Sequence, residues 1–201
     1  AVGKRFETIM KPAHQLTKYR IGSLKEMWIV SWPLILGLMS MSIMLFVDRL
    51  LLSRYSVDAL NAAASAGTAA WALMVLPISI AAISEVFVGR YHGQARFQDT
   101  GRPVWQMIWL SLLLTPLFIF LAHQLPPILF PNSPYASYEA TYFKVILYFC
   151  PFSIAAVGIS GFFIGIGRVR IVSVLAILSN IVNFIFAVPM IYGWGPFPEM
   201  G

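Results

Sequence analysis

One carboxylate lies between long apolar stretches of the sequence. Asp48 follows the apolar residues 43–47 and precedes Leu50, Leu51 and Leu52. A carboxylate in hydrocarbon is costly, and one found there usually faces a water-filled cavity or a basic partner. The sequence therefore leaves two interpretations of Asp48. It is either a titratable group that binds and releases a proton or a cation, or an interfacial carboxylate paired with Arg49 or Arg54.

Two amide side chains lie in the middle of another apolar segment. Asn180 and Asn183 are three residues apart, which places them on one face of a helix. Because amides are expensive in lipid, this face should turn toward the inside of a helix bundle. If this helix neighbours that of Asp48, the amides can orient the carboxylate, bond its protonated form or help to ligate a sodium ion. The alternative is a hydrogen-bonded lock between two helices.

The sequence contains few of the residue patterns that are typical of catalytic or metal-binding sites. The three histidines are scattered along the chain, and no Cys/His metal spacing, nucleophile motif or phosphate-binding loop is present. The single cysteine, Cys150, is interpreted as a small apolar packing residue. An intramembrane enzyme would show paired titratable groups at depth, and we expect only one carboxylate there. We therefore predict no catalytic residue, no metal site and no cofactor, and the protein is not expected to be an enzyme.

The composition indicates the elements that position these groups. Of the 201 residues, 59% are hydrophobic and 11% are charged, whereas soluble domains carry about 25% charged residues. Five segments without a charged residue are long enough for membrane-spanning helices, and their continuous apolar character excludes barrel strands. They cover approximately residues 27–47, 59–84, 104–122, 145–167 and 171–193. The predicted fold is an all-α polytopic membrane protein.

Basic residues indicate the orientation of these helices. Six precede the first segment, three follow the second and two follow the fourth, whereas the opposite side carries Arg49 and Arg54. Because cytoplasmic loops are rich in Lys and Arg, the N-terminus is predicted to be cytoplasmic, with residues 1–26 as a basic leader. The net charge of +6 then reflects topology and contacts with the lipid bilayer, and no nucleic-acid partner is expected.

Several residues within the segments suggest how the helices bend and pack. Each segment contains one proline: Pro33, Pro77, Pro116, Pro151 and Pro189. These predict helix kinks, either around a cavity or simply because proline is common in membrane helices. The small residues at 61–68 and the pair Gly161 and Gly165 predict close helix packing. Met41 and Met44 are candidates for an adaptable substrate cavity, although core or lipid contact would also suit them.

The order of these motifs resembles the multidrug and toxic compound extrusion (MATE) family. The sequence SWPLILG at residues 31–37, the Val47–Asp48 pair and residues 59–63 resemble the start of that family's first lobe. Residues 165–168 and 180–183 resemble its fourth and fifth helices, and residues 192–201 resemble the loop into its sixth. No single motif is specific, but their order across residues 23–201 is.

This resemblance implies a secondary antiporter of the bacterial inner membrane. Family members have two six-helix lobes and export small cationic or amphiphilic compounds in exchange for H⁺ or Na⁺. Asp48 matches the helix-one carboxylate of the N-lobe coupling site, and Asn180 and Asn183 match the polar part of helix five. The acidic residue that some proton-coupled members carry in helix five is absent here, so the coupling ion stays open.

The resemblance also implies that residues 27–201 form a partial N-lobe. The sequence starts at Ala1 rather than at methionine and stops before a sixth helix and a second lobe. We therefore expect a partial reading frame that does not transport alone. Two other functions are considered. A flippase for lipid-linked precursors has a related fold but would show a basic cavity, and the predicted spans contain no Lys or Arg. A non-transporting five-span scaffold protein is the other.

Overall fold

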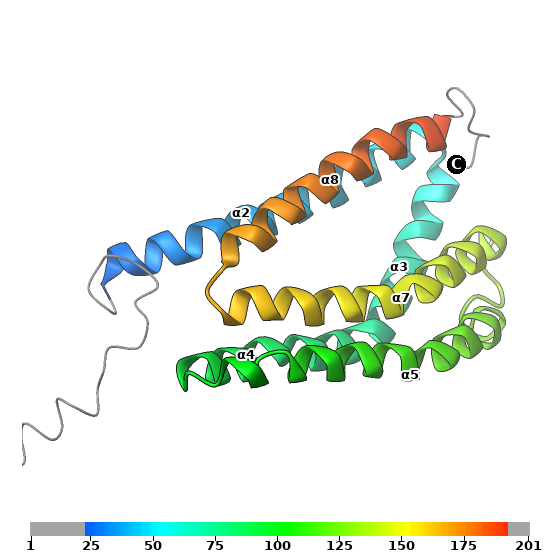
Figure 1. Ribbon diagram of the computed structural model, residues 1–201. Coiled ribbons are helices and arrows are strands. Elements are labelled where there is room, and N and C mark those ends of the chain that lie inside the picture. Colours follow the sequence, from blue (N-terminus) through cyan, green and yellow to red (C-terminus); the bar gives the residue numbers. More distant parts are fainter. Residues whose placement is uncertain (1–22, 193–201) are drawn as a thin grey trace, which may run out of the picture.

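The computed structural model describes residues 23–192, which fold into helices joined by short connections (Figure 1). The helices are α2 (Leu24–Tyr55), α3 (Val57–Ala82), α4 (Ser84–Gly93), the 3₁₀ turn η1 (Phe97–Asp99), α5 (Arg102–Gln124), α6 (Pro126–Leu129), α7 (Ala136–Gly165) and α8 (Val169–Tyr192). Five helical segments are long and apolar enough to cross a membrane: α2, α3 with α4, η1 with α5, α7, and α8. The predicted all-α membrane fold is confirmed over this range. Most of the predicted leader, and the motif at the end of the sequence, lie outside it.

Two helices extend well beyond the predicted spans. The side chain of Ser23 caps α2 by accepting a hydrogen bond from the backbone N–H of Glu26 at 3.3 Å. The helix continues to Tyr55, although the predicted span ends at residue 47. Likewise α7 begins at Ala136, before the predicted start at residue 145. Charged residues set both predicted limits, but a helix accepts charged side chains when they face protein or water.

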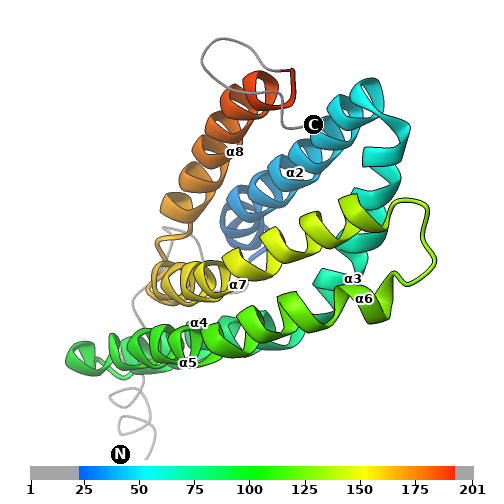
Figure 2. The same cartoon turned by 90° about the vertical axis from the view of Figure 1, so that its right-hand side faces the viewer.

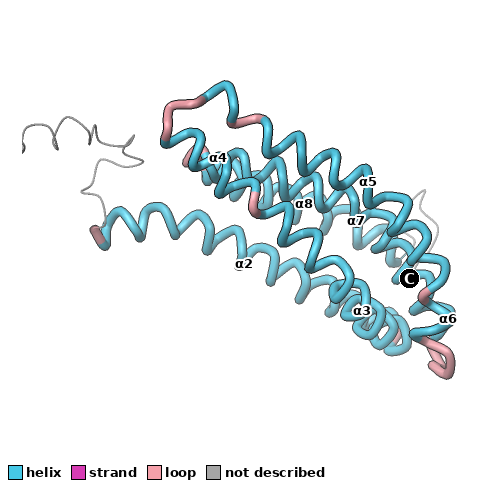
Figure 3. The backbone as a smooth tube through the Cα atoms, turned by 90° about the horizontal axis from the view of Figure 1, so that it is seen from below, coloured by secondary structure: helices cyan, strands magenta, loops and turns pink. Residues whose placement is uncertain are grey.

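Helix α7 lies at the centre of one group of helices. It packs against α3, α4 and α5, whereas α2 and α8 pack mainly against each other. Figures 1 and 2 show α2 and α8 running side by side, apart from the group around α7. Figure 3 shows the turn from α2 to α3 and the short helix α6 at the same end of the molecule. We call this the outer end, because the predicted topology places it outside the cell.

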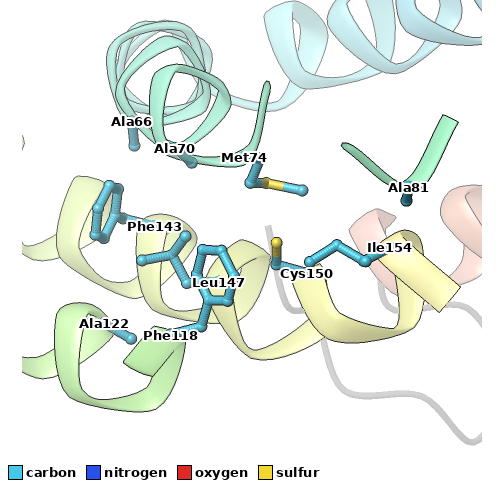
Figure 4. Packing of buried hydrophobic residues seen from close by; sticks show 10 residues of the cluster. All are labelled: Ala66, Ala70, Met74, Ala81, Phe118, Ala122, Phe143, Leu147, Cys150 and Ile154. Atoms are coloured by element: carbon cyan, nitrogen blue, oxygen red, sulfur yellow. The ribbon is translucent and has the colours of Figure 1, made fainter. Parts of the chain in front are cut away.

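The core of the α7 group is made of apolar side chains from three helices. Figure 4 shows α3, α5 and α7 contributing to one buried cluster, in which Cys150 is fully buried as an apolar packing residue. Of the small residues at 61–68 that were predicted to pack closely, Ala62, Ala63 and Ala66 are buried, whereas the other residues of the run are partly or fully exposed. Packing at these short distances gains dispersion contacts, which hold membrane helices together where no water drives association.

Glycines on α7 let α4 approach closely. A Cβ at Gly165 would lie 2.7 Å from the Val88 Cβ, and one at Gly161 would overlap the Ser84 Oγ. In the space that they leave, the Ser84 hydroxyl donates to the carbonyl of Gly158 at 3.2 Å. The predicted packing role of the Gly161 and Gly165 pair is therefore confirmed.

All five prolines lie inside helices: Pro33, Pro77, Pro116, Pro151 and Pro189. Pro77 and Pro151 are buried, whereas Pro116 is exposed on α5. The second span is interrupted after Pro77, where α3 ends at Ala82 and α4 begins at Ser84. That the prolines together bend the helices around a cavity stays a prediction.

The close contact of α4 and α7 can be tested with one added methyl group. Gly161→Ala places a Cβ onto the Ser84 Oγ and 3.0 Å from the backbone nitrogen of Glu85. The helices must separate to accept it, so we expect a loss of about 1–3 kcal/mol of unfolding free energy, measured by thermal unfolding of the full-length protein in detergent. Gly93→Ala is the matched control, because nothing lies within 4 Å of its Cβ position. Equal effects of the two variants would contradict the packing analysis.

Candidate functional site

A cavity of about 450 Å³ lies between α2 and α8. Asp48 and Met44 line it from α2, and Asn180 and Asn183 line it from α8. The remaining lining residues are Leu36, Met39, Ser40, Ile43, Val47, Ile177, Ile181 and Phe184. The α2 residues recur at helical spacing, which gives α2 one continuous face toward α8. The structure thus brings together the carboxylate and the two amides that the sequence singled out.

The Asp48 carboxylate is partly buried and is available for a ligand. Within residues 23–192, the structure gives Asp48 neither a hydrogen-bond partner nor an ion-pair partner. The interfacial pair with Arg49 or Arg54 is therefore not formed. A carboxylate that faces an apolar cavity without a basic partner in its lining attracts a cation.

The two amides differ in their surroundings. Asn180 is partly buried, and its Nδ2 donates to the Ser40 Oγ at 2.5 Å, across the α2–α8 contact. A second bond joins the same helices, from the Ser173 hydroxyl to the Pro33 carbonyl at 2.7 Å. Asn183 is exposed to the cavity and bonds to no other residue in the described part of the chain. Asn180 therefore locks the two helices as the alternative interpretation expects, and Asn183 keeps its polar atoms for a ligand.

Only one of the two methionine candidates lines the cavity. Met44 lines the cavity, but Met41 is 59% exposed and lies outside the lining. That Met41 contributes to a substrate cavity stays a prediction. Ser40 and Met39 were missed by the sequence analysis. The signal for Ser40 was its spacing of four residues from Met44, because Ser40, Met44 and Asp48 form one stripe of α2.

A second carboxylate is buried in the bundle, at the outer end. Glu139 on α7 is 4% exposed, one of its oxygens bonds with the Ser65 hydroxyl of α3, and its Oε2 has no partner within the described range. The sequence analysis did not single out Glu139, because the predicted span began at residue 145 and excluded the first turns of α7. That Asp48 is the one carboxylate at membrane depth stays a prediction. Glu139 is not part of the cavity between α2 and α8.

Metal-binding clusters are absent from residues 23–192, where no three His, Cys, Asp or Glu side chains gather. The two histidines in this range contact aromatic rings instead. His92 lies against Phe97, and the Nε2 of His123 lies 3.2 Å from the Tyr148 hydroxyl.

Residues 33–188 match the sequence model of the MatE family, a stretch that includes every residue of the cavity. The chain belongs to the MatE family. Members are membrane efflux transporters rather than enzymes, and with five helices able to span a bilayer this MatE protein is an integral membrane protein. No curated protein and no solved structure matches the chain significantly.

A double-mutant cycle tests the lock between α2 and α8. Ser40→Ala and Asn180→Ala each remove the bond between these side chains, so their effects on unfolding free energy should be non-additive by about 0.6 kcal/mol, the mean for hydrogen bonds within membranes. The same cycle with Asn183→Ala in place of Asn180→Ala is the control and should show additivity, because Asn183 does not bond to Ser40. Additive effects in both cycles would show that the hydrogen bond between Asn180 and Ser40 does not contribute to stability.

Proposed function

We propose that this MatE protein is a secondary antiporter that exports small cationic or amphiphilic compounds in exchange for H⁺ or Na⁺. The observation that carries the proposal is the position of Asp48. Its carboxylate is unpaired at the wall of the α2–α8 cavity, next to Asn180 and Asn183. The family supplies the broader activity, efflux across a membrane.

The cavity suits an amphiphilic cation. Its volume of about 450 Å³ is within the range of pockets that bury drug-sized ligands. Aliphatic, methionine and phenylalanine side chains form most of the lining, and the carboxylate supplies one negative charge. Methionine side chains adapt to ligands of different shape, so this lining favours a broad set of compounds over a single substrate.

The exchange of substrate for H⁺ or Na⁺ follows because both cations compete for the single negative charge of Asp48. A proton or sodium ion on Asp48 neutralises the charge that a cationic substrate would otherwise use. Binding of either cation therefore weakens binding of the other, and this reciprocal weakening is the thermodynamic basis of coupling. The amide oxygen of Asn183 supplies a further hard ligand for Na⁺, whereas a proton would need the carboxylate alone.

The complete transport cycle needs alternating access. In transporters built from two related lobes, the lobes move about a central site. We propose that the α2–α8 helices belong to the N-lobe of such an assembly in the inner membrane of a bacterium, where H⁺ and Na⁺ gradients are available. The experiments below therefore use the full-length transporter.

A lipid-linked precursor flippase is the second candidate, and one observation favours it. Arg49 lies inside α2 and bonds to α3 rather than extending to the surface, so a basic group is present within a spanning helix after all. The cavity at Asp48, however, has no basic side chain in its lining, and a pyrophosphate would be repelled there. The third possibility, a scaffold protein, requires neither the cavity nor the carboxylate.

Removing the charge of Asp48 tests the proposed role directly. In cells that express the full-length transporter, Asp48→Asn should abolish ion-coupled efflux of a fluorescent cationic dye without reducing the amount of protein in the membrane. The amide keeps the size of the side chain but cannot exchange a proton or balance a bound cation. Asp58→Asn is the matched control, because Asp58 is exposed in the first turn of α3, and it should leave efflux close to the wild-type rate.

Unchanged efflux in Asp48→Asn would exclude Asp48 from coupling. Proteoliposomes with an imposed pH gradient and no sodium, compared with a sodium gradient at constant pH, identify the coupling ion. Efflux driven by neither gradient would contradict the antiporter function, as would transport of a lipid-linked pyrophosphate in place of the dye.

A further inference from the structure

The side chain of Glu139 lies on the core-facing side of α7. Phe143 follows it by one helical turn and packs with Ala66 of α3 in the buried apolar cluster (Figure 4). Residues four apart on a helix share a face, so Glu139 continues the row of buried residues that holds α7 against α3. The residue is 4% exposed. A carboxyl group therefore occupies a position that the next turns of α7 fill with apolar side chains.

The Ser65 hydroxyl of α3 is within hydrogen-bond distance of two oxygen atoms. One is the Oε1 of Glu139, and the other is the backbone carbonyl of Ala62 at 3.3 Å. Both oxygens accept hydrogen bonds when Glu139 is ionised, but a serine hydroxyl carries a single hydrogen. An ionised Glu139 would therefore leave two oxygen–oxygen contacts with one hydrogen between them.

Within residues 23–192, no positive group is bonded to this carboxyl. Its Oε2 has no hydrogen-bond partner, and its Oε1 bonds with Ser65. The short helix α6, which packs against α7, has no charged or titratable side chain. The charged and titratable side chains on the other helices at this end, none of which bonds to Glu139, are Asp48 at the α2–α8 cavity, Arg49 at the Ala63 carbonyl, the exposed Asp58 of α3, His123 of α5 at the Tyr148 hydroxyl, and Tyr135, Tyr138, Tyr142 and Lys144 of α7.

The N-terminus of α7 stabilises a negative charge only in part. Glu139 lies in the first turn of this helix, where the helix dipole supplies about half of an elementary charge. No backbone N–H of that turn donates to the Oε2 of Glu139. A buried carboxylate needs a full opposite charge together with hydrogen bonds to its oxygens, and the residues described supply neither.

We propose that Glu139 and Ser65 form a proton-binding site, in which Glu139 is a neutral carboxylic acid. The acid O–H on Oε1 donates to the Ser65 Oγ, and the Ser65 hydroxyl donates to the Ala62 carbonyl. Each of the two contacts then has its own hydrogen, and no charge is buried. Oε2 becomes an uncharged carbonyl oxygen, which is far less costly to bury without a partner than a charged carboxylate oxygen.

This site is separate from the proposed coupling site. Glu139 lies between α7 and α3, and it is not part of the lining of the α2–α8 cavity. The inference therefore does not depend on the antiporter function. Release of the proton to water would leave one negative charge in the contact between α3 and α7, so this contact is most stable while the proton is bound.

Infrared spectroscopy of the purified full-length protein in detergent tests for the bound proton directly. A protonated carboxyl group has a C=O stretching band that an ionised carboxylate lacks, and ¹³C-labelled glutamate distinguishes glutamic from aspartic acid. We expect a glutamic-acid band in the wild type that is absent from Glu139→Gln and that disappears as the pH is raised. Asp58→Asn is the matched control, because it makes the same change at an exposed carboxylate, and it should retain the band.

The thermal midpoint of unfolding gives a second readout. In Glu139→Gln the amide N–H can donate to the Ser65 Oγ as the acid O–H does, so this variant mimics the protonated state. Its midpoint should equal that of the wild type at low pH. As the wild type loses its proton, the folded state retains a buried charge, so the wild type should become less stable than the variant as the pH rises. One proton changes the folding equilibrium by at most about tenfold per pH unit.

Ser65→Ala covers the case in which Glu139→Gln does not fold. The change removes the acceptor of the acid O–H without adding bulk. The C=O band of Glu139 should therefore remain but shift in frequency, and an unshifted band would overturn the proposed bond. Asp48→Asn should keep the Glu139 band, which separates a failure of this site from a failure of the antiporter function.

Three results would overturn the proton site. The first is the absence of any glutamic-acid band that depends on Glu139. The second is a Glu139→Gln variant that folds but is less stable than the wild type at every pH, since the ionised carboxylate would then serve the N-terminus of α7. The third is stabilisation of the wild type, but not of Glu139→Gln, by NaCl relative to choline chloride at constant pH, which would place a sodium ion where the proton is proposed.

Discussion

The arrangement of this protein depends on one constraint, which is that an ionised or strongly polar side chain cannot lie in hydrocarbon without a partner. Three such groups near the outer ends of the helices turn toward other helices. Asp48 turns toward α8, Arg49 toward α3, and Glu139 bonds with Ser65 between α7 and α3. The outward faces of the same helices are left to leucine, isoleucine and phenylalanine. A helix with few polar groups thus obtains its rotational orientation from them.

The two groups of helices are held by different kinds of contact. Around α7, glycines and alanines permit short distances to α3 and α4, and the contact is close over the length of the helix. Between α2 and α8, two hydrogen bonds from Asn180 and Ser173 accompany a contact that leaves room for a cavity. A densely packed scaffold and a looser, hydrogen-bonded pair are the physical setting that a ligand site requires, since the ligand must enter between helices that stay aligned.

Much of this was predictable from the sequence, for reasons that can be stated residue by residue. Asp48 and Asn183 are costly in lipid, so it could be predicted that their side chains face away from the lipid. The small residues of α3 and α7 predicted close helix packing. The neighbourhood of α2 and α8 was not predictable from periodicity, because nothing in a single helix specifies its partner. Met41 is not part of the lining of the α2–α8 cavity, and its contribution to a substrate cavity stays a prediction. Glu139 was missed because charged residues were taken as the limits of the spans, although α7 already begins at Ala136.

The adjacency of Asp48 and Arg49 has a consequence for the movement of α2. The two residues are joined by one peptide bond, so a rotation of α2 about its own axis that withdraws the carboxylate from its cavity also withdraws the guanidinium from the Ala63 carbonyl. Both charges would then face apolar surroundings at the same time, and the two penalties would add. Axial rotation of α2 is therefore opposed at both residues, whereas tilting leaves each charge on its own side of the helix.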